Sequence, residues 1–144
     1  MSGPARDAGM RAVARVRSVR EQDSRIGLQQ ALAEQRRHEA EVSEVRARIE
    51  RTDVFAAGSA ASFLALRASL DALGQVLRTA DQEVATSRTI SEAAYGHWQQ
   101  DKARLSAVEV LLERRDGARR AEAARREARD LDEVAARMWQ RGRP

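Results

Sequence analysis

Residues 63–112, "FLALRASLDALGQVLRTADQEVATSRTISEAAYGHWQQDKARLSAVEVLL", decide the fold of this chain. Apolar and small side chains recur through this stretch at alternating spacings of three and four residues. That spacing is the heptad repeat of a coiled coil, in which one stripe of a helix packs against a second helix. The middle of the stripe is polar, because it includes Ser87, Ser91 and Asp101. We therefore predict a long helix with a narrow and partly polar seam.

The composition predicts that the rest of the chain is helical as well. Proline occurs only at Pro4 and Pro144, so no proline interrupts a helix between them. Charged residues make up 33% of the 144 residues and aromatic residues only 3%, which is typical of long helices rather than of a thick core. The absence of cysteine excludes disulfides and thiolate metal sites.

A second periodic segment precedes the heptads, from about residue 5 to residue 51. Gln35 and His38 interrupt its apolar stripe, which we assign to Val13, Val16, Val19, Ile26, Leu28, Leu32, Val42, Val45 and Ile49. Between the two segments, "TDVFAAGSAAS" (residues 52–62) contains turn and cap residues, and Ser59 or Ser62 is a candidate N-cap of the second helix.

Neither helix can bury its stripe alone, so we predict an all-α fold, a long antiparallel two-helix coiled-coil hairpin. We assign residues 1–144 to a single domain, with helix one at 5–51, the tip at 52–62 and helix two at 63–140. A break of helix two near Gly74 or Gly117 stays open at this point. Helix two is longer than helix one, so its end is expected to extend past its partner.

Charge is distributed unevenly along the chain, whose net charge is +4. Residues 1–20 carry five arginines and one aspartate, and residues 113–144 carry ten basic and seven acidic groups. A hairpin would bring these two positive ends together. The longest uncharged run, residues 54–66, is too short to span a bilayer, and the first 20 residues lack the apolar region of a signal peptide. We expect a cytoplasmic protein.

The sequence offers no catalytic, cofactor or metal site. The two histidines, His38 and His97, lie far apart in sequence, and the glycines form no phosphate-binding loop. Nucleic-acid binding is disfavoured, because the arginines alternate with acids and stacking aromatics are few. A generic coiled-coil scaffold is a stronger alternative than nucleic-acid binding.

The segment "LLERRDGARRAEAARREARDLDE" (residues 111–133) raises the question of function. After Leu112 the seam positions become arginines, and a stripe in another phase follows at Ala121, Ala124, Ala128, Leu131, Ala135 and Met138. One interpretation is a solvated helix held by ion pairs between residues three or four apart. The other is a docking helix for a negatively charged partner, because arginine and tryptophan dominate interface energetics.

The segment "RLSAVEVLLERRDGARRAEAARREARDLDEVAAR" (residues 104–137) resembles the C-terminal part of the flagellar export protein FliJ family. The shared features are a leucine-rich stretch, the pair Glu113–Arg114, a charged alanine-rich helix and the ending Leu131-Asp132-Glu133. The layout of residues 15–49 is also similar to the start of that family. The middle of the second helix departs from it in being rich in Ala, Ser and Thr. A stalk homologue from an injectisome is therefore an alternative, beside a generic coiled-coil scaffold.

The resemblance implies a non-enzymatic stalk, similar to the gamma subunit of rotary ATPases, in bacterial flagellum biogenesis and type III protein export, and so in motility and chemotaxis. It implies insertion into the hexameric export ATPase, contact with the export gate protein, links to export chaperones, and peripheral association with the inner face of the cell membrane. The candidate ATPase-binding residues are Arg114, Arg115, Arg119, Arg120, Arg125, Arg126, Leu131, Met138 and Trp139. The candidate tip surface comprises Val54, Phe55, Phe63 and Leu64, and a local cap that closes the hairpin is an equal alternative for it.

Overall fold

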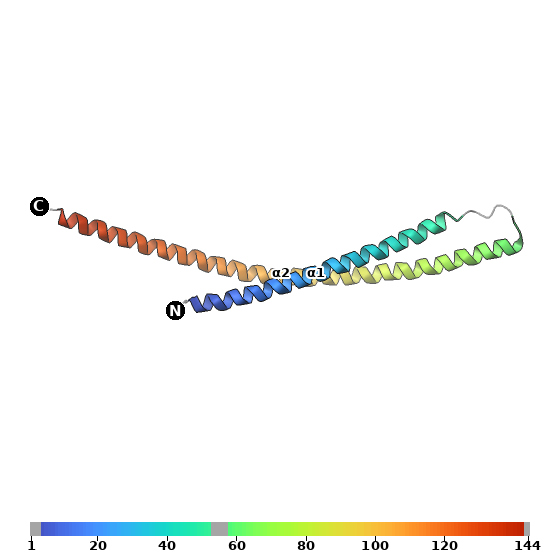
Figure 1. Ribbon diagram of the computed structural model, residues 1–144, viewed down its shortest axis with the longest axis horizontal. Helices are drawn as coiled ribbons and strands as arrows, with labels where there is room; N and C mark the ends of the chain where they lie inside the picture. The colour runs from blue at the N-terminus through green and yellow to red at the C-terminus, as the bar shows by residue number, and fades with distance from the viewer. Residues whose placement is uncertain (1–3, 53–57, 143–144) are drawn as a thin grey trace. The chain divides into compact units, whose positions relative to one another are not determined.

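A computed structural model describes residues 4–52 and 58–142 of the chain. The fold is all-α and consists of two helices, α1 (Pro4–Glu50) and α2 (Ala60–Arg141), which pack against each other as a hairpin (Figure 1). With 82 residues against 47, α2 is the longer helix, as predicted. The predicted tip lies partly outside the described residues.

The ends of the helices next to the tip follow the local sequence. At the end of α1 the Thr52 amide donates to the carbonyl of Ile49, and its hydroxyl donates to the carbonyl of Arg48. Gly58 has a φ of 155°, a backbone conformation that residues other than glycine rarely adopt. Ser59 is the N-cap of α2, because its Oγ accepts the amide of Ser62 at 3.2 Å and so satisfies a donor that the first helical turn leaves open.

Helix α2 is continuous, and both Gly74 and Gly117 lie within it. The break considered for either glycine does not occur. Neither α1 nor α2, as far as the structure describes them, is long and apolar enough to cross a membrane.

Each helix contributes to two compact units. Unit 1 contains Met1–Val19 and Lys102–Pro144, and unit 2 contains Arg20–Asp101. Ion pairs from α1 to α2 occur in unit 1 at Asp7 and in unit 2 at Glu39 and Arg46. The assignment of the chain to one domain stays a prediction.

The seam of α2 lies where the heptad pattern predicts it. The buried residues of this helix are Ala80, Val84, Ser87, Ser91 and Asp101, all of them predicted seam positions. Most of the other seam residues, from Leu66 to Leu112, are half-buried, whereas Phe63 is exposed. The core of unit 2 is correspondingly thin, since it consists of Val42, Ala80 and Val84 with Leu77 packed against them.

The stripe predicted for α1 is correct at Leu28 and from Val42 onward. Leu28, Val42 and Val45 are buried, but five of the assigned residues are exposed: Val13, Val16, Val19, Ile26 and Leu32. Before Leu28, the half-buried positions that continue its heptad toward the N-terminus are Met10, Ala14, Arg17, Glu21 and Ser24. In unit 2 a polar contact accompanies this difference, because Trp98 Nε1 of α2 donates to Glu21 Oε1 of α1 at 2.8 Å.

Candidate partner-binding surfaces

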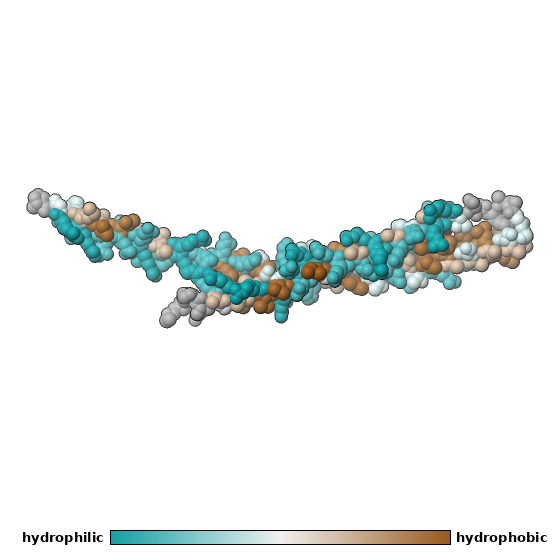
Figure 2. Space-filling model, viewed as in Figure 1, coloured by the Kyte–Doolittle hydropathy of each residue, from teal (hydrophilic) through white to brown (hydrophobic). Residues whose placement is uncertain are grey.

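The last part of α2 and the residue that follows it, together residues 123–142, are exposed at every position, and we call them the C-terminal arm. Leu131, Met138 and Trp139 keep 64%, 69% and 65% of their surface exposed. Figure 2 shows this end of the chain as mostly hydrophilic, with hydrophobic patches close to the terminus. Large apolar groups at such exposure are unusual in a helix that is otherwise so highly charged.

Ion pairs within one helix stabilise the arm without covering these side chains. Arg126 Nε lies 3.2 Å from Glu122 Oε1, and Arg137 pairs with Glu133, both across one helical turn. Pairs of this kind contribute about 0.2–0.5 kcal/mol each to a helix. The local interactions therefore explain why the arm is helical, but they do not explain its apolar stripe.

The apolar stripe of the arm is a second face of α2 rather than a displaced seam. Val110, Gly117, Ala124, Leu131 and Met138 follow one another at intervals of seven residues. Each of them occupies the heptad position farthest from the seam, and Val110 is exposed although neighbouring Leu112 is half-buried. The two stripes thus overlap around residues 110–117, on opposite faces of one helix.

The six arginines predicted to bind a partner fall into two groups. Arg115 and Arg119 pair with the carboxylate of Asp7 on α1, with 3.4 Å between Arg115 Nη1 and Asp7 Oδ1. Asp7 itself is buried, with only 5% of its surface exposed, so this cluster belongs to the seam of unit 1. Arg114, Arg120, Arg125 and Arg126 are exposed.

The predicted tip surface is described only in part. Phe63 and Leu64, in the first turn of α2, are exposed. Val54 and Phe55 lie outside the described residues. The described half of this surface presents two large apolar side chains to solvent.

An exposed apolar surface on α1 escaped the sequence analysis. In unit 1, Val13, Val16 and Val19 are exposed, although we had assigned them to the seam. The signal was present in their spacing of three and three, which departs from the alternation of three and four that a seam requires.

The seam of unit 2 contains polar pairs that connect the two helices. Ser91 Oγ donates to Gln35 Oε1 at 2.6 Å, Trp98 Nε1 donates to Glu21 Oε1 at 2.8 Å, and Arg88 Nη2 donates to Glu39 Oε1 at 3.1 Å. The pKa of Glu39 is held below its ordinary value by the hydrogen bond from Gln35 and by the hydrogen bonds and charge of Arg88. The polar groups of these pairs form hydrogen bonds with each other, whereas a seam of leucines would only bury apolar surface.

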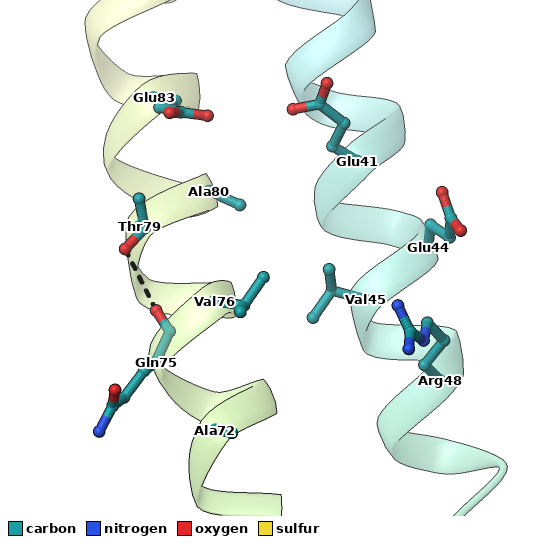
Figure 3. Close-up of a pocket in the computed structure, with 10 residues that line it drawn as sticks. All are labelled: Glu41, Glu44, Val45, Arg48, Ala72, Gln75, Val76, Thr79, Ala80 and Glu83. Atoms are coloured by element: carbon teal, nitrogen blue, oxygen red, sulfur yellow. Dashed lines mark hydrogen bonds between the residues drawn. The ribbon is translucent and has the colours of Figure 1, made fainter. Parts of the chain in front are cut away.

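An open groove runs between the two helices of unit 2. Figure 3 shows Val76 and Ala80 of α2 directed toward Val45 of α1. Charged side chains surround these apolar ones, among them Glu41, Glu44, Arg48 and Glu83. The groove continues toward His38, to which Glu41 and Glu83 lie close.

Comparison with known families accounts for the hairpin and its charged arm. The family model described as "Flagellar FliJ protein" matches residues 8–144, nearly the whole chain. The chain belongs to the flagellar FliJ family. Searches of curated proteins and of solved structures gave no match.

Membership in the FliJ family implies a component of the flagellar export apparatus. The FliJ family is a non-catalytic stalk or escort family, and its partners belong to the flagellar export machinery. The polar seam and exposed arm of this FliJ-family chain are consistent with a structural role, in which surfaces rather than a pocket contact other proteins.

Proposed function

We propose that this chain is a stalk and escort component that inserts into the hexameric flagellar export ATPase, stimulates it, and contacts the export gate protein. The ATPase-binding surface in this proposal is the C-terminal arm with the arginines next to it. The chain acts in the cytoplasm, at the inner face of the cell membrane, where the gate is located. Export chaperones are further partners.

The exposure of the C-terminal arm is the observation that supports the proposal most directly. The apolar stripe of the arm ends in Leu131 and Met138, and Trp139 follows Met138 directly. These three residues keep about two thirds of their surface exposed. A partner that covers these side chains gains about 25 cal/mol for each Å² of apolar surface removed from water. Burial of this stripe can therefore supply affinity, and the exposed arginines can supply orientation and association rate.

The contacts of the arginines define a reduced set of residues for this surface. Because Arg115 and Arg119 hold Asp7, we assign them to the hairpin rather than to the ATPase. The proposed ATPase-binding residues are Arg114, Arg120, Arg125, Arg126, Leu131, Met138 and Trp139. Phe63 and Leu64 at the tip are the proposed contact with the gate.

A charge reversal tests the ATPase-binding surface. We expect Arg120→Glu with Arg125→Glu to raise the concentration that half-maximally stimulates the export ATPase by about tenfold, because the proposal requires a negatively charged partner surface, which these glutamates would repel. The matched control is Arg67→Glu with Arg78→Glu, which changes the charge equally at exposed positions of α2 in unit 2. Circular dichroism should show the same helicity in both variants.

A second variant tests the apolar stripe. Leu131→Ala, Met138→Ala and Trp139→Ala together should weaken stimulation while leaving the midpoint of urea unfolding nearly unchanged, because these side chains are exposed in the hairpin. If both variants stimulate the ATPase as well as the control does, the arm is a solvated helix and a scaffold function gains support.

A further inference from the structure

His38 lies among three carboxylates in the middle of unit 2. Its Nδ1 is 3.2 Å from Glu41 Oε2 and 3.3 Å from Glu83 Oε2, and its Nε2 is 3.4 Å from Glu34 Oε1. The His38 side chain is only 15% exposed, whereas the carboxylates are about half exposed. The imidazole thus lies within the helix pair, and its acidic neighbours lie at the edge.

The heptad repeat brings these groups together. His38 is a seam residue of α1, four residues before the buried Val42 and seven before the buried Val45. Glu34 and Glu41 lie one turn before and after it on the same helix, and Glu83 comes from α2, directly before the buried Val84. The facing helices therefore contribute separate ligands to one point, as in metal sites built within helix bundles.

The charges of this cluster do not balance among its own members. Nδ1 can donate only one hydrogen, yet two carboxylates lie within 3.3 Å of it. Three carboxylates surround one imidazole, which supplies at most a single positive charge. Arg37 pairs with Glu34 at 2.5 Å and lies 3.8 Å from Glu41, so its single charge offsets only part of the three carboxylates. A cation between Nδ1, Glu41 and Glu83 would neutralise the excess.

The spacing of the three ligand atoms suits a transition metal. In a tetrahedral zinc site, bonds of about 2.0–2.1 Å place neighbouring ligand atoms about 3.3 Å apart. The distances from Nδ1 to the two carboxylate oxygens agree with this value, and all three atoms lie within 4.8 Å of one another. An imidazole ligand favours zinc-like ions, whereas Mg²⁺ and Ca²⁺ prefer sites made of oxygen alone.

We propose that His38, Glu41 and Glu83 bind a divalent transition-metal ion of the zinc class, with water completing its coordination. The ion links α1 to α2 in unit 2 and stabilises the pairing of the helices. This inference is independent of the proposed ATPase-binding surface, since none of its residues belongs to that surface.

Titration of the full chain, without an affinity tag, with ZnCl₂ tests the proposal. Calorimetry at pH 7 should show one ion bound per chain, and zinc should raise the melting temperature, whereas MgCl₂ should not. His38→Gln should weaken zinc binding at least about tenfold, as loss of a ligand does. His97→Gln is the matched control, because His97 also lies 3.3 Å from a carboxylate oxygen, that of Asp101, but belongs to no group of three potential ligands among the described residues.

Glu83→Gln provides a second variant that keeps the imidazole, and it should also lose zinc binding while retaining helicity. The proposal is overturned if zinc binds the wild type no more tightly than it binds His38→Gln. It is also overturned if His38→Gln changes only the pH dependence of the melting temperature, because a proton on His38 would then be the cation that balances the carboxylates.

Discussion

At the scale of single residues, Asp7 shows how a distant contact changes the meaning of a motif. The arginines at positions 115 and 119 first suggested a surface for an acidic partner. Their carboxylate partner, Asp7, is 108 residues from Arg115 in sequence, at the other end of the chain. No local sequence pattern could reveal this cluster, because only the antiparallel pairing of α1 with α2 brings its three side chains together.

Replacement of this carboxylate should destabilise unit 1. Asp7→Asn removes the charge that holds Arg115 and Arg119, and leaves two like charges close together. Because both arginines are partly exposed, water screens the interaction, and we expect a loss of about 1–2 kcal/mol in the free energy of unfolding. Urea unfolding measures this loss, with Asp23→Asn at an exposed position as the control. Equal stability of the two variants would show that the cluster contributes nothing.

At the scale of elements, a seam could be predicted from the sequence where large apolar residues occupy its heptad positions. The seam of α2 could be placed from sequence because leucines mark its two ends and fix its phase through the polar middle. In the first half of α1 the seam consists of Ala14, Arg17, Glu21 and Ser24, and the more apolar valines lie outside it. Hydrophobicity alone therefore selected the wrong face, whereas strict spacing would have selected the right one.

The pairing of the helices in unit 2 should weaken in acid. The pKa of Glu39 is lowered in the folded chain, so its hydrogen bonds with Gln35 and Arg88 stabilise the fold above the unfolded pKa, near 4.5. That stabilisation is lost as the pH falls through the lower, folded pKa. Glu39→Gln should therefore lower the melting temperature at pH 7, by at most about 3 °C, and the difference from wild type should vanish near pH 2.5.

Thermal melting between pH 7 and pH 2.5 measures this convergence, with Glu50→Gln at an exposed position as the control. A difference that stayed constant across this range would mean that the charge of Glu39 does not stabilise the helix pair.

At the scale of the whole molecule, the chain combines a paired region with a single helix that continues beyond its buried contacts. Residues 123–142 have no buried position, so they contribute helicity without contributing to a core. The overhang was predicted from the unequal lengths of the two helices. The apolar stripe of the arm could not be recognised in full from the sequence. It begins with Val110, Gly117 and Ala124, two of which are small, and this part overlaps in sequence with the last residues of the seam.

Truncation should separate folding from function. Removal of residues 123–144 should reduce the helical signal in proportion to the residues lost. It should change the free energy of unfolding, measured in urea, by less than about 0.5 kcal/mol, as is usual for exposed positions. Stimulation of the export ATPase should be abolished. A large loss of stability would show that the arm also supports the hairpin.

The polar pairs of unit 2 have a mechanical consequence. A seam made only of leucines can slide by one heptad, about 10 Å along the axis, and find equivalent packing. Here such a slip would separate Ser91 from Gln35, Trp98 from Glu21 and Arg88 from Glu39 at the same time. It would leave the partly buried groups of the first two pairs without partners. The two helices of this unit therefore have one preferred alignment, and a force applied to one of them along its axis is passed to the other instead of being dissipated by sliding.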